Sequence, residues 1–376
     1  MILATPPKIQ NPTDLLSVVP LTLGYQPAES MLVICIRHNG GLGMVARTSL
    51  SDIHCLKAAN QISEMVSRNA VEDGAEQAFI VYYTSDTGEQ AKQHLRNLTQ
   101  VFQGRLESQD VECQVWLIDD TGYQHLVCDY DDCCPPNGYP LIDLESTAVR
   151  ATLVYQGYAA ADSRAAYLKL KKASEKDRKL AQEGAVRFEE RKKGRAVNWR
   201  FEALTAWLFA SELVRHKETI PPRVLGMLGA ALTETTVRDA VLMACIPGGL
   251  STAAALLEEH REATHTTREI LESIVRIDDA IAPSSELCRT ATQVLSAVAA
   301  HADGPRCVVP LTLLGFLAWW SGDGTRANTR LEEATLLDSE YQFAQVLTRV
   351  QRQYLRPGWL RARAREAVRL RQKAAA

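Results

Sequence analysis

The sequence predicts an α/β domain with a mixed sheet and flanking helices, followed by an all-α domain with a tetratricopeptide-like helical hairpin. Continuous apolar runs alternate with segments of helical periodicity in the first 143 residues, whereas no strand pattern occurs from residue 144 onward. Proline and glycine turns divide that second part into helical segments. We therefore expect an α/β domain over 1–143, a charged helical connector over 144–200 and a helical domain over 201–376.

The first predicted elements are a capped helix and a β-hairpin. The segment 11–24 offers an N-cap at Asn11 or Thr13, a Pro20 that would kink the helix, and a Gly24 that would end it. "MLVICIR" at 31–37 is the apolar run typical of a strand buried on both faces. The Asn-Gly-Gly sequence that follows predicts a hairpin to "MVARTSL".

The rest of the α/β domain alternates helices and strands. Apolar residues recur at helical spacing over 52–69 and 88–103. The runs "AFIVYY" at 78–83 and "VWLI" at 115–118 predict two further buried strands, and "QHLVCDY" predicts another after a turn. The order is therefore strand, helix, strand, helix, strand, with a hairpin at the start.

One helical pair in the second half has tetratricopeptide spacing. Counting from Leu314-Gly315, the small residue of the repeat falls on Ala327 and the large apolar one on Leu331. A single degenerate repeat predicts helical hairpins at about 308–355 that stack in a tetratricopeptide-like way. It does not predict a regular superhelix with a peptide groove.

Composition excludes several classes of protein. Hydrophobic residues make up 46% and charged residues 23%, which excludes a mostly disordered chain. No apolar run approaches the roughly 20 residues of a membrane span, and the N-terminus lacks the pattern of an export signal. Nine dispersed cysteines, an odd number, indicate reduced thiols. We expect a cytoplasmic protein.

The net charge of −3 hides two basic stretches. Residues 169–196 carry 11 Lys and Arg against 5 Asp and Glu, and residues 349–376 carry 9 against 1. The first stretch alternates in sign, which is typical of a solvated helix face. The last predicts an amphipathic cationic helix that docks on the acidic body of the protein or binds nucleic acid or an anionic partner through its arginines, Arg361, Arg363, Arg365 and Arg369.

Polar residues at the ends of the predicted strands form one candidate ligand site. Ligands of α/β sheets collect beyond the carboxyl ends of strands, where these side chains could hold a metal and a phosphate. The alternative is local: Asp86 or Thr87 can cap the following helix, and "DDTG" is a common turn sequence. The candidate residues are Arg37, His38, Asp86, Asp119 and Asp120.

"CDYDDCCPPNGYP" at 128–140 is a second candidate. Thiolates of Cys128, Cys133 and Cys134, with His125 or Asp131 nearby, are suitable ligands for zinc. Adjacent cysteines, however, point in different directions, so the sequence favours a turn with packed cysteines over a zinc site. No basic residue adjoins the thiols to lower their pKa, which disfavours redox use.

Familiar catalytic motifs are missing. There is no phosphate-binding P-loop motif and no G-x-S-x-G elbow, and "GGLG" at 40–43 joins two strands rather than a strand and a helix. His260 and His265 lie five residues apart, which separates them around a helix. These observations favour a protein that is not an enzyme.

The opening stretch resembles a bacterial family. "DLLSVVPLTLGYQPAESMLVICIR" followed by "MVARTSL" is similar to the start of the family called domain of unknown function 4192. Cys128, the Cys133-Cys134-Pro135 sequence and Gly138-x-Pro140 match further features of that family, and "LLGFLAWWSGDGTRANTRLEEA" resembles its C-terminal helical hairpin. The resemblance implies no reaction, substrate or cofactor, and it makes a designed role for the cysteine stretch more plausible.

Three hypotheses remain. The first is a non-enzymatic cytoplasmic binding or scaffold protein with a protein partner. The second is a ligand- or metal-binding α/β enzyme that uses the acids at the strand ends, with zinc as a candidate cofactor. The third is a nucleic-acid-binding protein that uses the arginine-rich C-terminal helix.

Overall fold

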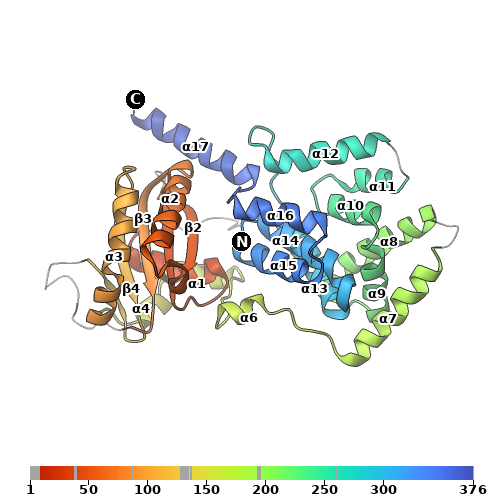
Figure 1. The fold of residues 1–376 in the computed structure, drawn as a ribbon, viewed down its shortest axis with the longest axis horizontal. Coiled ribbons are helices and arrows are strands. Elements are labelled where there is room, and N and C mark those ends of the chain that lie inside the picture. The colour runs from red at the N-terminus through yellow and green to blue at the C-terminus, as the bar shows by residue number, and fades with distance from the viewer. Residues whose placement is uncertain are drawn as a thin grey trace. The chain divides into compact units, whose positions relative to one another are not determined.

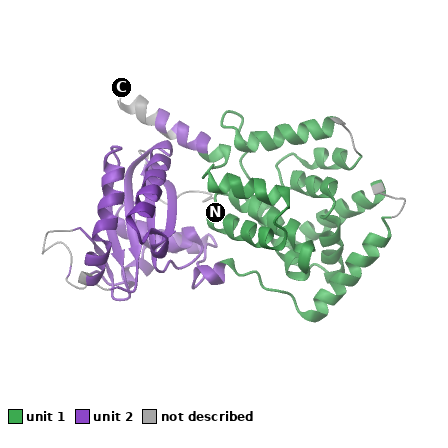
Figure 2. Ribbon diagram, in the orientation of Figure 1, with its two compact units in different colours: residues 1–2, 168–360 green, residues 3–167, 361–376 purple. Residues whose placement is uncertain are grey.

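The computed structural model describes residues 9–37, 40–86, 88–127, 135, 138–192, 196–258 and 261–375. The chain divides into two compact units (Figure 2). One is an α/β unit of residues 3–167 together with 361–376, and the other is a helical unit over 168–360. The α/β domain was predicted to end at residue 143, with a connector over 144–200. In the structure, the boundary between the two units falls between residues 167 and 168.

A five-stranded mixed sheet forms the centre of the α/β unit (Figure 1). The strands are β1 (Ser30–Arg37), β2 (Leu42–Ser49), β3 (Ala75–Tyr83), β4 (Glu112–Ile118) and β5 (Tyr123–His125). Their order in the sheet is β2-β1-β3-β4-β5. β1 pairs antiparallel with both β2 and β3, β3 pairs parallel with β4, and β4 pairs antiparallel with β5. The predicted hairpin is present, and the strand predicted over "QHLVCDY" is shorter, because a turn begins at Leu126.

Helices cover both faces of this sheet. α1 (Pro12–Leu23) packs Leu15, Leu16 and Val19 on one face of the sheet. α2 (Leu56–Glu72) and α3 (Gly88–Glu107) cover the other face. The short 3-10 helix η1 (Leu50–Ile53) precedes α2. α1 begins as the sequence predicts, because the Asn11 side chain accepts a hydrogen bond from the Asp14 N–H at 2.8 Å. It ends at Gly24, whose φ of 82° is in the left-handed region.

Three short helices after the sheet belong to the same unit. They are α4 (Ile142–Glu145), α5 (Ala148–Tyr155) and α6 (Arg164–Leu168). The Arg150 guanidinium of α5 donates to the Ser17 carbonyl of α1 at 2.9 Å, and the Gln26 N–H donates to the Ala161 carbonyl at 2.8 Å. Residues 144–167 therefore complete the α/β unit.

The helical unit confirms the prediction of an α-helical second half. Its helices are α7 (Glu175–Glu190), α8 (Ala196–Arg215), α9 (Pro222–Ala231), α10 (Thr235–Ala244), α11 (Leu250–Leu257), α12 (Arg261–Val275), α13 (Ser285–His301), α14 (Val308–Trp320), α15 (Gly324–Leu337) and α16 (Gln342–Arg352), with η2 (Gly304–Cys307) before α14. The last helix, α17 (Gly358–Ala375), begins in this unit, and its residues from 361 onward belong to the α/β unit. The central helix is α14, in which every residue is buried, and α15 packs along it.

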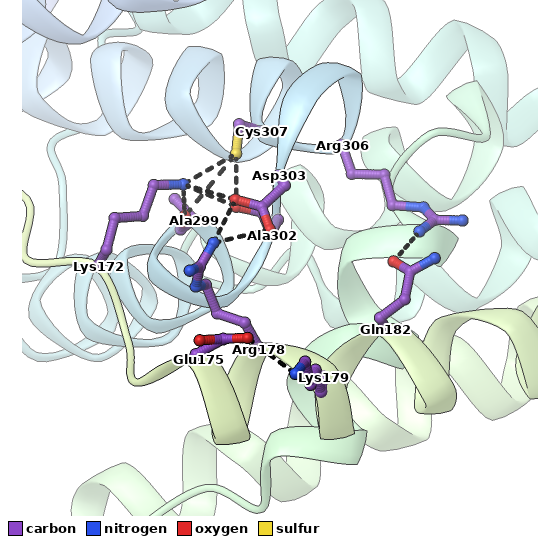
Figure 3. Close-up of polar contacts among 10 residues, drawn as sticks. All are labelled: Lys172, Glu175, Arg178, Lys179, Gln182, Ala299, Ala302, Asp303, Arg306 and Cys307. Atoms are coloured by element: carbon purple, nitrogen blue, oxygen red, sulfur yellow. Dashed lines mark hydrogen bonds and ion pairs between the residues drawn. The ribbon is translucent and has the colours of Figure 1, made fainter.

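The basic stretch before and within α7 is paired with acids and carbonyls of the helical unit (Figure 3). Lys172 donates to the Ala302 carbonyl at 2.8 Å and lies 3.6 Å from the Asp303 carboxylate. Arg178 donates to both carboxylate oxygens of Asp303 at 3.1 Å, and Arg306 donates to Gln182 at 2.6 Å. These contacts attach α7 to the segment around η2, so the described part of the stretch belongs to the helical unit.

Candidate functional site

One end of the sheet collects the carboxyl ends of β2, β3 and β4. Ser30, at the start of β1, is in register with both Ser49 and Tyr83, and Tyr83 is in register with Ile118. The loops that contain Asp86, Asp119 and Asp120 leave from this end. The structure therefore places three of the five predicted residues, Asp86, Asp119 and Asp120, at this end of the sheet. His38 lies outside the described residues.

Arg37 lies at the opposite end of the sheet. Because β1 runs antiparallel to β3, the end of β1 is in register with Ala75, at the start of β3. The Arg37 guanidinium donates to the Asp73 carboxylate at 3.0 Å and to the Leu42 carbonyl at 2.7 Å. Asp73 also accepts from the Met44 N–H at 2.7 Å. Arg37 thus fixes the β1–β2 hairpin, and the expected grouping with the aspartates was wrong.

Asp119 is used by its own turn. One oxygen of its buried carboxylate accepts from the Thr121 N–H at 2.7 Å, from the Thr121 hydroxyl at 2.6 Å and from the Gly122 N–H at 3.0 Å. Asp120, by contrast, is exposed. This is the turn geometry that the "DDTG" sequence offers as its local alternative.

The acids beside β3 also have local partners. The Asp86 carboxylate accepts a hydrogen bond from His94 Nδ1 at 2.7 Å in an exposed pair. Glu29, which the sequence analysis did not single out, accepts from the Ser85 N–H at 2.8 Å and the Ser85 hydroxyl at 3.0 Å. Its φ of 41° lies in the left-handed region, which is uncommon for a residue with a side chain. The carboxylates of Asp86 and Glu29 therefore hold the loops at this end of the sheet in place.

The sequence did not point to a cluster of Tyr25, Ser30 and Arg47 at the same end of the sheet. Arg47 of β2 reaches the neighbouring strand β1 and donates to the Ser30 hydroxyl through Nε at 3.0 Å and Nη2 at 2.6 Å. Tyr25, buried after the end of α1, lies near enough to Arg47 that a charge on its phenol would raise the pKa of the guanidinium. A signal was available, since Tyr25, Ser30 and Arg47 all lie in the stretch that carries the family resemblance.

The three cysteines of the second candidate, Cys128, Cys133 and Cys134, lie outside the described residues. Within the described residues, no group of three potential metal ligands occurs. His125, at the end of β5, packs edge-on against Trp116, and burial lowers the pKa of its imidazole. The zinc site stays a prediction.

The arginines of the C-terminal helix lie on α17. Arg363, Arg365 and Arg369 are exposed, Arg361 is half-buried, and Ala364 between them is buried. Arg369 lies 3.9 Å from Glu366. The helix is therefore amphipathic as predicted, and its role in binding stays a prediction.

α8 carries three exposed apolar side chains on the surface of the helical unit. Val197, Leu208 and Phe209 are exposed to 46%, 38% and 49% of their area. The opposite side of the helix carries Trp199 and Trp207, which are buried in the core of the unit. At 100° per residue, the three side chains fall within a sector of about 120°. The same sector carries the exposed polar residues Asn198, Thr205 and Glu212. We call Val197, Leu208 and Phe209 the α8 surface.

Comparisons with known proteins identify a family without a described activity. No curated protein matches the chain, and no solved structure matches it. Among the helices of the described residues, none combines the length and apolar character needed to cross a membrane. The family model described as a domain of unknown function (DUF4192) matches residues 12–358. Because that match covers nearly all of the sequence, this chain belongs to the DUF4192 family.

Proposed function

We propose that this protein is a non-enzymatic cytoplasmic binding or scaffold protein, and that its helical unit binds an apolar helix of a partner protein on the α8 surface. The observation that carries the proposal is that the Leu208 and Phe209 side chains are exposed on α8, whose other side packs into the core of the unit. Exposed aromatic and leucine side chains on a rigid helix are also typical anchors of protein interfaces.

The buried side of α8 makes the exposed side rigid. Trp199 stacks on Phe188 of α7 at 4.4 Å between ring centroids, and its indole N–H donates to the Phe188 carbonyl at 2.8 Å. Trp207 and Ala203 are buried in the same core. The α8 surface is therefore presented without a large loss of conformational entropy on binding, which favours affinity.

The tetratricopeptide-like hairpin fits a supporting role in this proposal. Gly315 of α14 lies against Leu331 and Ala327 of α15, which are the three positions that the repeat spacing pairs. Since α14 is buried along its whole length, its hairpin offers no groove of its own. Partner binding is therefore assigned to the outside of the unit.

The enzyme hypothesis has less support at the sheet edge. Asp119 and Glu29 accept hydrogen bonds that define their loops, and Asp86 is paired with His94. A general base needs a carboxylate that can approach a substrate proton, and these carboxylates are held by the protein itself. Nucleic-acid binding by α17 remains the alternative, and its mark would be salt-dependent affinity that is lost when 357–376 are removed.

Site-specific cross-linking tests the proposal. A photoreactive benzoylphenylalanine replaces Leu208 in the full chain in its native cell, and Leu336, exposed to 86% in the same unit, is the matched control position. We expect one protein to cross-link at position 208 and not at 336. That protein, once purified, should bind the wild type at least about tenfold more tightly than Phe209→Asp.

Two results would contradict the proposal. If position 208 cross-links only to a second copy of the chain, the α8 surface is a self-association surface. If the purified partner binds Phe209→Asp as tightly as the wild type, the α8 surface is not its binding site.

A further inference from the structure

We propose that Tyr25, Ser30, Arg47 and Arg164 of the α/β unit form a binding site for a phosphate-class oxyanion. All four residues lie in the α/β unit, away from the α8 surface in the sequence. The site is built around the partly buried guanidinium of Arg47, whose hydrogen-bonding capacity is only partly used.

Arg47 is held by a hydroxyl and not by an acid. Its Nε and Nη2 donate to Ser30 Oγ, which in turn donates to the Ala28 carbonyl at 2.6 Å. Ser30 is fully buried, so this hydroxyl fixes the plane of the guanidinium. Of the five N–H donors of Arg47, two are used, and the other three have no acceptor among the described residues.

Tyr25 supplies a second unused donor. The side chain is 1% exposed, and its buried hydroxyl has no hydrogen-bond partner among the described residues. The Arg47 guanidinium lies near this phenol, because a negative charge on Tyr25 would raise the pKa of Arg47. A buried hydroxyl without a partner costs free energy, which is recovered when a ligand accepts its hydrogen bond.

The positive potential of the site comes from two arginines. Burial lowers the pKa of Arg47, and the positive charge of Arg164 lowers it further, so the two cations are near each other. Arg164 is exposed and has no acidic partner among the described residues. The exposed Asp52 offsets part of this potential, since its charge raises the pKa of Arg47, but it makes no hydrogen bond to the guanidinium.

The backbone holds the second arginine in place. The Ala161 N–H donates to the Gly24 carbonyl at 2.9 Å, and the Gln26 N–H donates to the Ala161 carbonyl at 2.8 Å. The Tyr167 ring then packs on Tyr25 at 5.4 Å between centroids. The start of α6, with Arg164, is therefore fixed beside Tyr25.

These groups suit a tetrahedral oxyanion. Guanidinium N–H pairs bind two oxygens of a phosphate at once, and the phenol can donate to a third. A second arginine favours a doubly charged group over a carboxylate. Ser30 orients Arg47 and has no free proton to donate, so it is a positioning residue.

Titration calorimetry with inorganic phosphate at constant ionic strength tests the site, with sodium acetate as the carboxylate control. We expect phosphate to bind the full chain, and acetate to bind at least about tenfold more weakly. Arg164→Gln and Tyr25→Phe should each weaken phosphate binding by about tenfold. Arg105→Gln, which removes an exposed arginine of α3, should leave phosphate binding unchanged.

Tyr25→Phe separates binding from folding. It removes a buried hydroxyl that has no partner, so the midpoint of thermal unfolding without phosphate should stay the same or rise. A structural role for the hydroxyl would instead lower that midpoint and leave phosphate affinity unchanged. The proposal is overturned if the wild type does not bind phosphate, if acetate binds equally well, or if Arg105→Gln weakens binding as much as Arg164→Gln.

Discussion

Gly226 of α9 packs directly on the backbone of Ala181 in α7, so that a Cβ at position 226 would overlap the Ala181 carbonyl. Gly184 of α7 makes the reciprocal approach to the Arg223 backbone. This pair of close contacts brings α7 against α9 and attaches the charged stretch to the helical unit. The sequence analysis expected a solvated connector there, because glycines inside a charged helix give no periodic signal.

Gly226→Ala should destabilise the helical unit. The added methyl group has no space beside Ala181, so the free energy of unfolding should fall by about 2–3 kcal/mol. Gly229→Ala in the same helix is the matched control, because its nearest neighbour would be Val298 Cγ1 at 3.5 Å, an ordinary contact. The control should be neutral or stabilising by up to about 1 kcal/mol. Equal midpoints of thermal unfolding for the two variants would refute the close packing.

Asp73→Ala should destabilise the α/β unit. Asp73 is 2% exposed and holds Arg37 and the Met44 N–H, and its removal leaves a guanidinium that is 10% exposed without its acid. Breaking such a buried pair costs about 3–5 kcal/mol. Asp86→Ala breaks only the exposed pair with His94 and should cost less than about 1 kcal/mol. Urea denaturation of both variants checks the difference, and a small effect at Asp73 would contradict the structural role of Arg37.

Thiol reactivity should follow burial. At neutral pH iodoacetamide should modify the exposed Cys55 well before the buried Cys245 and Cys288, because the thiolate is the nucleophile and burial raises the pKa of Cys288 to about 11. Peptide mass spectrometry after timed quenching measures each site, and denaturant should make their rates similar. Cys288 reacting as fast as Cys55 in the folded protein would contradict its burial.

The same pKa shift predicts a loss of stability in base. Burial raises the pKa of the Cys288 thiol to about 11, whereas in the unfolded chain the thiol has its ordinary pKa of 9.0. The unfolded state therefore binds fewer protons in that interval, and the free energy of unfolding falls as the pH rises through it. Cys288→Ala should show a shallower decline between those pH values than the wild type. Identical slopes would show that Cys288 does not contribute.

Local sequence signals predicted the individual elements well. Asn11 and Gly24 mark the ends of α1, and the apolar runs match β1, β3 and β4 to within a few residues. Strand direction was not predictable, because a fully buried run has the same pattern in a parallel and an antiparallel strand. That direction decides that Arg37 lies away from Asp86 and Asp119.

The new candidate site escaped prediction for a related reason. Ser30 and Arg47 are separated in sequence and meet because β1 pairs with β2 in a specific register, and Tyr25 is held by a bridge to Ala161. A lone arginine in a strand pattern carries no catalytic or binding motif. Similarly, the apolar residues of α8 are visible in the sequence, whereas their exposure depends on which side of the helix packs against α7 and the core.

Photo-cross-linking at position 208, followed by binding of the purified cross-linked protein to the wild type and to Phe209→Asp, tests whether the α8 surface binds a partner protein. We expect one partner at position 208, none at the control position 336, and a loss of affinity of at least about tenfold in Phe209→Asp. Because Phe209 is 49% exposed, that variant should unfold at nearly the same temperature as the wild type. Unchanged partner affinity in a folded Phe209→Asp protein would contradict a scaffold role for the α8 surface.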